Sequence, residues 1–181
     1  MHSSKRVTLQ TLLTAAQIQE RVAVLGQQIN HDYADTTALC LIGVLKGAWM
    51  FLADLIRYIN LPVTCHFIGA SSYGKHISHN GVVHLTLDLA EPIEDLDVIL
   101  VEDIVDTGLT MHYLVETLLL RNPRCIRTCT LLDKPSRRIV PFQPDYVGFA
   151  IADYFVVGYG LDLAEAYRNL PYVAICHFSD S

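Results

Sequence analysis

Three carboxylates fall within one short segment, VILVEDIVDTGLT, which covers residues 98–110. Glu102 and Asp103 directly follow an apolar run, and Asp106 begins the sequence Asp-Thr-Gly. Carboxylates this close repel one another unless hydroxyl groups or a divalent cation share their charge. They accept hydrogen bonds from hydroxyls and bind Mg²⁺ well. The segment therefore predicts a site for a ligand with neighbouring hydroxyls, for a divalent cation, or for both.

The residues around these carboxylates predict a strand, a loop and a helix. The apolar run is typical of a buried strand in a mostly parallel sheet, and residues 109–120 place Leu114, Val115 and Leu118 on one helical face. Ligands of open α/β sheets bind at the carboxyl ends of strands, and unpaired N–H groups at a helix N-terminus suit a phosphate. Together these features describe a pocket for a ribose phosphate. A solvated acidic turn would explain any two of the carboxylates, but not the whole pattern.

Alternating strands and helices are expected to position this segment. A first helix is expected over residues 15–28, with Ile18, Val22 and Leu25 on its inner face, and a second over residues 48–59. Besides the strand of the acidic segment, strands are expected at residues 37–45, 61–70, 82–89, 126–133, 146–152 and 172–176. This order favours an α/β fold with a mostly parallel twisted sheet and helices on both faces, as a single domain over residues 1–181.

Composition narrows the class of protein. The net charge of −6 argues against a general surface for nucleic acid or for anionic membranes. No stretch approaches the roughly eighteen apolar residues needed to span a bilayer, and MHSSKRVTLQ lacks the apolar core of a signal peptide. The five cysteines are odd in number and lie mostly in apolar runs, which is typical of reduced, buried thiols in a cytoplasmic protein. The eight histidines form no zinc-binding pattern.

The segment VEDIVDTGLT resembles the phosphoribosyl pyrophosphate binding motif of type I phosphoribosyltransferases, and within them the hypoxanthine-guanine phosphoribosyltransferases. Other segments extend the resemblance from about Val44 to Arg168. It implies the fold of that family, with a small hood and lid region, Mg²⁺ as cofactor, and a homodimer or homotetramer. The implied activity is purine salvage. Ribose 5-phosphate would pass from phosphoribosyl pyrophosphate to hypoxanthine or guanine, giving IMP or GMP and pyrophosphate.

The resemblance assigns roles within the acidic motif. Glu102 and Asp103 would hold the ribose hydroxyls, directly or through Mg²⁺, and Asp162 would be a further Mg²⁺ ligand. Asp106 would act as the general base that exchanges the proton at purine N7. The 5′-phosphate would be bound by the N–H groups of five consecutive residues, Asp106, Thr107, Gly108, Leu109 and Thr110, with the two threonine hydroxyls.

Pyrophosphate contacts are implied at Lys46, Gly47, Arg168 and Arg138. Lys46 and Gly47 end an expected strand, where a lysine is a compact cation facing the same crevice as the acidic motif. Relatives often have a cis peptide bond in this Leu-Lys-Gly turn. Taken alone, the tripeptide fits an ordinary strand-to-helix turn with a surface lysine.

The polar loop 71–81 resembles the mobile lid of the family, in which a serine and a tyrosine, here Ser72 and Tyr73, close over the reacting groups. Exclusion of water from an electron-poor ribose carbon is the physical reason for such a lid. The sequence from His76 onwards departs from the Ser/Thr-rich pattern of bacterial relatives. A flexible hairpin loop is the alternative interpretation.

The resemblance places the purine against three residues. Lys134 would donate to the 6-oxo group, and because an ammonium has donors and no acceptor, it would disfavour the 6-amino group of adenine. Phe155 would stack on the base, which contributes about 1–3 kcal/mol per base, and Val156 would offer backbone groups to its edge. Taken alone, Phe155 would be a core residue and Asp162 a helix cap.

Two other functions remain open from the residues. One is a regulator that binds phosphoribosyl pyrophosphate and controls RNA or DNA. Such proteins often lose the acid–base residue or the base pocket and present a basic surface. The presence of Asp106, Lys134 and Phe155 in an acidic chain argues against this class. The other is a pyrimidine or xanthine phosphoribosyltransferase, because Lys134 does not separate hypoxanthine, guanine and xanthine.

Overall fold

The computed structural model describes residues 6–72 and 83–179, and its centre is a six-stranded sheet in the order β4-β3-β2-β5-β6-β7. Five of these strands are parallel, and β4 pairs antiparallel with β3 at one edge. The prediction of a mostly parallel sheet is therefore confirmed. The strands are β2 (Leu39–Leu45), β3 (Val63–Ser72), β4 (Val83–Leu87), β5 (Asp97–Val105), β6 (Cys125–Asp133) and β7 (Tyr146–Ala150).

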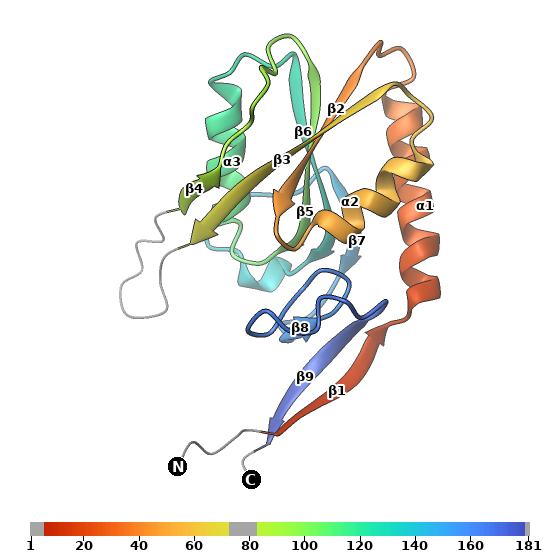
Figure 1. Cartoon of the computed structure of the whole chain (residues 1–181), viewed down its shortest axis with the longest axis vertical. Helices are drawn as coiled ribbons and strands as arrows, with labels where there is room; N and C mark the ends of the chain where they lie inside the picture. The colour runs from red at the N-terminus through yellow and green to blue at the C-terminus, as the bar shows by residue number, and fades with distance from the viewer. Residues whose placement is uncertain (1–5, 73–82, 180–181) are drawn as a thin grey trace.

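Helices cover both faces of this sheet, as predicted. Helices α1 (Ala15–Asp32) and α2 (Trp49–Leu55) lie on one face, and α3 (Leu109–Leu119) lies on the other (Figure 1). Alternate residues of one strand serve the two cores. Leu39 and Leu41 of β2 pack with α1 and α2, whereas Cys40 and Ile42 pack with α3. Burial on both faces explains why the central strands are continuous apolar runs.

The helix boundaries follow from local chemistry. Thr14 forms a capping box with Gln17 at the start of α1, and the predicted inner residues of this helix are buried. The helix continues to Asp32, four residues beyond the predicted end at residue 28. The second predicted helix is shorter than expected, because α2 ends at Leu55 and continues only as a 3₁₀ turn, η1 (Ile56–Tyr58).

A second, antiparallel sheet contains β1 (Arg6–Leu13), β9 (Val173–Ser179) and β8 (Val156–Val157), in the order β1-β9-β8. It lies beyond the carboxyl ends of the parallel strands (Figure 1). The strand predicted at residues 172–176 is confirmed as β9, but it belongs to this second sheet and not to the parallel one, and β1 was not predicted. An apolar run reveals burial but not the partner strand, because the pairing here joins segments far apart in sequence.

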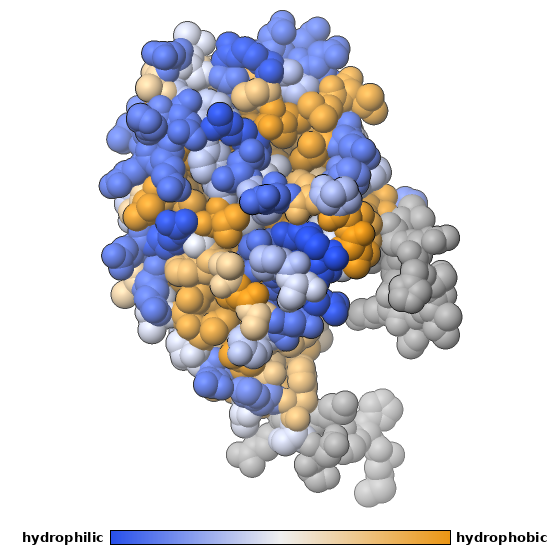
Figure 2. All heavy atoms as spheres, turned by 180° about the vertical axis from the view of Figure 1, so that it is seen from behind, coloured by the Kyte–Doolittle hydropathy of each residue, from blue (hydrophilic) through white to orange (hydrophobic). Residues whose placement is uncertain are grey.

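The surface carries apolar side chains in scattered positions. On the face seen in Figure 2, apolar surface occurs as separate patches between hydrophilic side chains. Exposed large apolar residues come from several elements, among them Trp49, Phe67 and Leu120. Scattered exposure of this kind is ordinary for a folded protein. Among the described residues, no helix combines the length and the apolar character needed to cross a membrane.

All five cysteines are free thiols. Cys40, Cys129 and Cys176 are buried, Cys125 is half-buried and Cys65 is exposed. Burial raises the pKa of the Cys129 thiol well above its ordinary value. The expectation of buried, packing cysteines is therefore confirmed for three of them and is wrong for Cys65.

An ion pair stabilises the amino end of the main sheet. Asp97 begins β5 and is buried, and Arg124 Nε donates to its Oδ1 at 2.8 Å. The Thr36 hydroxyl and the Cys125 thiol donate to the same carboxylate. The hydrogen bond from Arg124 holds the pKa of Asp97 well below its usual value, and the Thr36 hydroxyl adds to this effect.

This lowered pKa predicts how stability depends on pH. The pair contributes fully above about pH 4, the pKa of Asp in an unfolded chain, and the contribution is lost as the pH falls towards the folded-state value. Arg124→Met should therefore lower the free energy of unfolding at neutral pH and flatten its decline between about pH 5 and pH 3. Urea unfolding of both proteins across this range measures the effect. Parallel stability curves would contradict the prediction.

Candidate active site

Strand β5 carries two of the three carboxylates itself. It continues to Val105, which pairs with Asp133 of β6, so Glu102 and Asp103 belong to the strand and only Asp106 lies in the loop. This differs from the expected acidic loop. The Glu102 and Asp103 residues are only 7% and 8% exposed, because strands pack on both sides of β5.

Burial dominates the electrostatics of this pair. It raises the pKa of Glu102 well above its usual value, and the charge of Asp103 raises it further. Burial also raises the pKa of Asp103, against the opposing charge of Arg168. The N–H of Asp103 donates to Glu102 Oε1 at 3.1 Å, and the N–H of Ile104 donates to Asp103 Oδ1 at 2.7 Å. Two buried carboxyls so placed would be stabilised by a cation or by hydroxyl donors.

The donor chemistry of this pair fits Mg²⁺. Both side chains offer hard oxygen ligands, and Mg²⁺ commonly uses one or two carboxylates with water and substrate phosphates for its other positions. In residues 6–72 and 83–179, no three His, Cys, Asp or Glu side chains gather closely enough to hold a metal. Asp162 therefore does not complete a ready-made ligand set with Glu102 and Asp103.

The predicted phosphate loop connects β5 to the N-terminus of α3. Gly108 precedes the helix with φ of +85°, a conformation that favours glycine. A small cavity of about 80 Å³ opens at this loop. Its walls are Ile104, Val105, Asp106, Thr107, Gly108, Thr110 and Met111. Leu109 is absent from these walls, and its N–H lies 3.4 Å from Thr107 Oγ1. The cavity has the size and the helix N-terminus that suit one phosphate group.

Arg138 lies behind this loop. Its guanidinium donates to the carbonyl oxygens of Val105 and Phe142 at 3.0 Å, and to that of Asp106. It also pairs with Asp133. All three nitrogens are thus engaged within the protein. This placement indicates that Arg138 supports the loop, and its expected contact with pyrophosphate stays a prediction.

Arg137, which the sequence left without a role, faces the catalytic candidate. Arg137 Nε lies 3.1 Å from Asp106 Oδ1, and Arg137 Nη1 lies 3.6 Å from Asp153 Oδ2. The 3₁₀ turn η2 (Pro135–Arg137) directs it there. Lys134 Nζ lies 3.5 Å from the other oxygen of Asp153. The turn therefore brings two cations and two carboxylates to one side of the site.

A second cavity, of about 280 Å³, brings the expected purine-binding residues together. Its walls are Asp103, Ile104, Asp106, Lys134, Phe155, Val156, Leu161 and Asp162. Asp106 borders this cavity and the phosphate cavity alike. Ile104 and Leu161 were not expected from the sequence, because apolar residues that line a pocket look like core residues. The volume suits a planar base, and the shared carboxylate would face both ligand groups.

Phe155 forms an exposed wall of this cavity. The residue is 48% exposed, so the alternative interpretation as a core residue is wrong. Its ring meets that of Phe178 edge to face, with centroids 5.7 Å apart and an interplanar angle of 67°. The Phe155 carbonyl accepts from the N–H of Cys176 at 2.8 Å, and Val156 pairs with Ile175. Strand β9 therefore positions the aromatic wall, which sequence reasoning missed.

The turn at Lys46 packs directly on Asp103 of the buried carboxylate pair and on the loop 158–168. The peptide bond between Leu45 and Lys46 is cis. A Cβ at Gly47 would lie 1.5 Å from Asp103 Oδ2. A Cβ at Gly160, which has φ of +102°, would lie 2.0 Å from the carbonyl oxygen of Gly47. Glycine at these two positions lets three segments of the site touch.

Acidic residues of the loop 158–168 pair with Lys46 and Arg168, the two cations that are expected to bind pyrophosphate. Arg168 Nη2 lies 2.8 Å from Asp162 Oδ1, and Arg168 Nη1 donates to the carbonyl of Gly160 at 2.7 Å. Lys46 Nζ lies 3.0 Å from Glu165 Oε2. Among the described residues, the buried Nε of Arg168 has no hydrogen-bond partner. Asp162 caps no helix, because the residues after it form turns, so that alternative is wrong.

The expected lid falls mostly outside the described residues. Ser72 ends β3, opposite Val83 of β4. Tyr73 and the rest of the loop to Gly81 lie outside the described residues. Strands β3 and β4, which flank the expected lid in sequence, form the antiparallel edge of the sheet.

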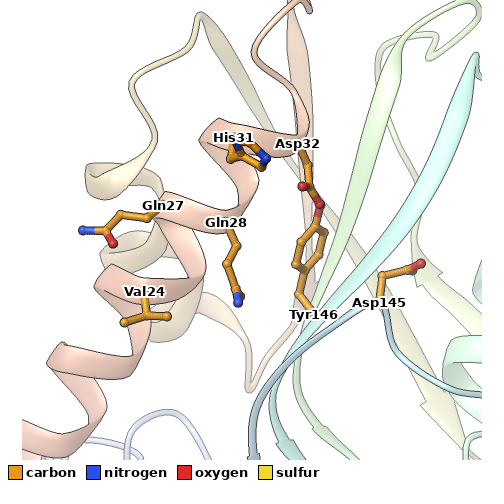
Figure 3. A pocket seen from close by; sticks show the side chains of 7 residues that line it. All are labelled: Val24, Gln27, Gln28, His31, Asp32, Asp145 and Tyr146. Atoms are coloured by element: carbon orange, nitrogen blue, oxygen red, sulfur yellow. The ribbon is translucent and has the colours of Figure 1, made fainter.

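A more spacious surface hollow lies elsewhere and lacks this chemistry. It measures about 470 Å³ and opens between α1 and the start of β7 (Figure 3). There Asp32 and Tyr146 point toward one another, with a hydrogen bond of 2.7 Å, and Arg127 binds both at 2.8 Å. These polar groups satisfy each other at the amino end of the sheet. We therefore place the active site at the smaller cavities on the carboxyl ends.

Comparisons with known proteins identify the family. Residues 9–164 match the family model of the phosphoribosyl transferase domain. The chain is 47% identical to a hypoxanthine phosphoribosyltransferase of Salmonella typhimurium, over 92% of this chain and 94% of the relative. It is 50% identical to a hypoxanthine-guanine phosphoribosyltransferase of Mycobacterium bovis, over 90% of this chain and 83% of the relative.

Solved structures give the same result. The crystal structure of a hypoxanthine-guanine phosphoribosyltransferase from Bacillus anthracis superposes with a TM-score of 0.88 at 44% identity, over 95% of this chain and 100% of that one. A hypoxanthine phosphoribosyl transferase of Trypanosoma cruzi, solved to study how its C-terminal region affects oligomeric state and enzymatic activity, has a TM-score of 0.88 at 41% identity. It covers 93% of this chain and 91% of its own.

Proposed function

Because the chain belongs to the phosphoribosyltransferase family, among its hypoxanthine-guanine members, we propose that it transfers ribose 5-phosphate from phosphoribosyl pyrophosphate to hypoxanthine or guanine. The products are IMP or GMP and pyrophosphate, and the role is purine salvage. The observation that carries the proposal is one carboxylate, Asp106, that borders a base-sized cavity and a phosphate-sized cavity. A base and a ribose phosphate placed there would meet beside it.

The ribose phosphate is held by β5 and the loop after it. The N–H groups of residues 106–110, at the positive end of α3, bind the 5′-phosphate. Leu109 contributes only its backbone, and Thr107 and Thr110 add hydroxyls. Glu102 and Asp103 accept hydrogen bonds from the ribose hydroxyls. The same two carboxylates would hold Mg²⁺, which would supply positive charge against the pyrophosphate.

The base lies between Phe155 and the acidic loop. Phe155 is braced by Phe178 and stacks on the purine face, while Lys134 donates to the 6-oxo group. Val156 presents backbone groups to the purine edge from β8. Asp106 takes up the proton of purine N7 as N9 attacks the ribose carbon, and it returns a proton to N7 only in the reverse reaction. Arg137 pairs with Asp106 and keeps it directed at the cavity edge.

Pyrophosphate departs on the side of the site formed by the Gly47 turn and the loop 158–168. The ribose carbon develops positive character as its bond to pyrophosphate breaks, and negative charge grows on the leaving oxygen. Lys46 and Arg168 lie where the Gly47 turn meets the loop 158–168, and they stabilise that charge.

Assembly and location complete the proposal. We infer a homodimer or homotetramer from the related enzymes, and a cytoplasmic location from the free cysteines and the housekeeping role of salvage.

A panel of bases tests the proposal. Purified protein with Mg²⁺ and phosphoribosyl pyrophosphate should convert hypoxanthine and guanine, leave adenine unchanged, and reveal its preference for xanthine. Lys134→Met keeps most of the length of the unbranched side chain but removes its donors. It should lower kcat/KM for hypoxanthine by about 10- to 100-fold, as expected for a hydrogen bond from a charged group. Nucleotide formation is followed by absorbance.

Two results would contradict this reading. Turnover of adenine as fast as hypoxanthine would remove Lys134 from base selection. Tight binding of phosphoribosyl pyrophosphate without turnover of any base would favour a regulatory protein on the same fold.

A further inference from the structure

We propose that Glu165 is an internal anion that occupies the pyrophosphate subsite of the ligand-free enzyme and leaves it when pyrophosphate or phosphoribosyl pyrophosphate binds. The inference rests on the proposed function, which assigns Lys46 and Arg168 to the pyrophosphate group. It adds a residue that tunes the affinity for the substrate and the release of the product.

The two oxygens of Glu165 face the two cations. Its Oε2 lies 3.0 Å from Lys46 Nζ, and its Oε1 lies 3.5 Å from Arg168 Nη2. Lys46 follows β2, whereas Arg168 lies in a loop far along the chain. One carboxylate therefore bridges two segments, as one pyrophosphate group would do.

This bridge is suited to exchange. The side chains of Lys46 and Glu165 are 67% and 66% exposed, so water screens the pair and an incoming anion can reach it. Lys46 donates a hydrogen bond to the Glu165 carboxylate, so the contact is an ion pair between exposed groups. A diphosphate carries more charge than one carboxylate and would displace it from the same two cations.

The loop directs Glu165 at the subsite. The N–H of Glu165 donates to Asp162 Oδ2 at 2.8 Å. Ala164, Glu165 and Tyr167 have φ values of +51°, +66° and +72°, in the left-handed region that non-glycine residues rarely adopt. The backbone thus adopts an unfavourable conformation in the segment that presents the carboxylate. Strain of this kind clusters where a segment holds or releases a ligand.

The contact between Gly160 and Gly47 keeps the two segments together when Glu165 moves. Lys46 and Arg168 would then stay near each other after the exchange. Without the Glu165 carboxylate, one competitor of pyrophosphate for the two cations would be gone, while Asp162 would still pair with Arg168 at 2.8 Å.

Glu165→Gln tests the proposal, because it removes the charge and keeps the size of the side chain. Calorimetric titration with Mg²⁺-pyrophosphate should show binding that is about three- to thirtyfold tighter than in the wild type, the range for two exposed ion pairs. The KM for phosphoribosyl pyrophosphate should fall in the same direction, and the KM for hypoxanthine should not change. The matched control is Glu20→Gln, which makes the same charge change on the exposed surface of α1.

The possible results distinguish a failure of the Glu165 proposal from a failure of the proposed transferase activity. Pyrophosphate affinity in Glu165→Gln that is unchanged or weaker than in the wild type would overturn the proposal. An equal gain in Glu20→Gln would also overturn it, since the effect would then come from net charge. A wild type that is inert with every base would refute the proposed function instead, and the calorimetric comparison reports on Glu165 without turnover.

Discussion

Replacing Asp106 with Asn is expected to lower kcat by about 10²- to 10⁴-fold, the usual contribution of general acid–base catalysis. The amide keeps the shape of the side chain but does not accept a proton at neutral pH. Binding of phosphoribosyl pyrophosphate should be nearly unchanged, because the 5′-phosphate is held by backbone N–H groups of the loop. Steady-state kinetics and direct titration of phosphoribosyl pyrophosphate measure the two effects.

A neighbouring carboxylate provides the control for Asp106. Asp153 contacts Lys134 at 3.5 Å and Arg137 at 3.6 Å, but it does not line the base cavity. Asp153→Asn should therefore change kcat far less than Asp106→Asn. Unchanged turnover in Asp106→Asn would remove this residue from the role of base. Equal losses in both variants would assign the effect to the local charge and not to proton transfer.

Replacing Gly160 with Ala should lower the free energy of unfolding by about 3 kcal/mol or more, among the larger effects of single substitutions. The φ of +102° is accessible to glycine and costly for alanine, and the new methyl would lie 2.0 Å from the carbonyl oxygen of Gly47. Both sides of this contact are backbone, so relief requires the turn after Lys46 to move. Pyrophosphate affinity should fall with stability.

Gly43→Ala is the control that separates the loss of stability from the loss of pyrophosphate affinity. Its methyl would lie 2.6 Å from Leu52 Cδ2 and 3.2 Å from atoms of the Phe67 ring, so it overpacks the core without touching the site. We expect a loss of about 1–3 kcal/mol with unchanged pyrophosphate affinity. Urea unfolding and calorimetry give both quantities. Wild-type stability and affinity in Gly160→Ala would show that the contact is not essential to the site.

The central sheet and its helices were predictable because their signals are local. Buried parallel strands are apolar runs, and the inner face of α1 repeats at the spacing of a helix, so Ile18, Val22 and Leu25 identified it. The motif in β5 combines a strand end, a glycine turn and a helix start in consecutive residues. Its position at the carboxyl end of the sheet follows from topology alone.

The remaining parts depend on contacts between distant segments. The pairing of β1 with β9 joins the two ends of the described chain, and no local pattern encodes it. Phe178 and Glu165 act only through partners elsewhere, Phe155 and Lys46. The alternative interpretation of Asp162 as a helix cap implied a helix after it, but left-handed residues such as Ala164 break this segment into turns.

The two arginines near the phosphate loop also show what sequence alone does not predict. Arg137 and Arg138 are adjacent in sequence, yet one pairs with Asp106 at 3.1 Å and the other supports the loop from behind. The η2 turn separates their directions, and sequence position alone does not.

The position of β9 at the centre of the small sheet also affects the order in which the parts of the site become available during translation. Chains emerge from the N-terminus, so the whole phosphate loop is made before β9, which braces Phe155 through Phe178. A nascent chain halted before β9 would carry the residues for the sugar phosphate but lack the support of its aromatic wall. We therefore expect the nascent chain to complete its purine-binding cavity only after β9 has been synthesised.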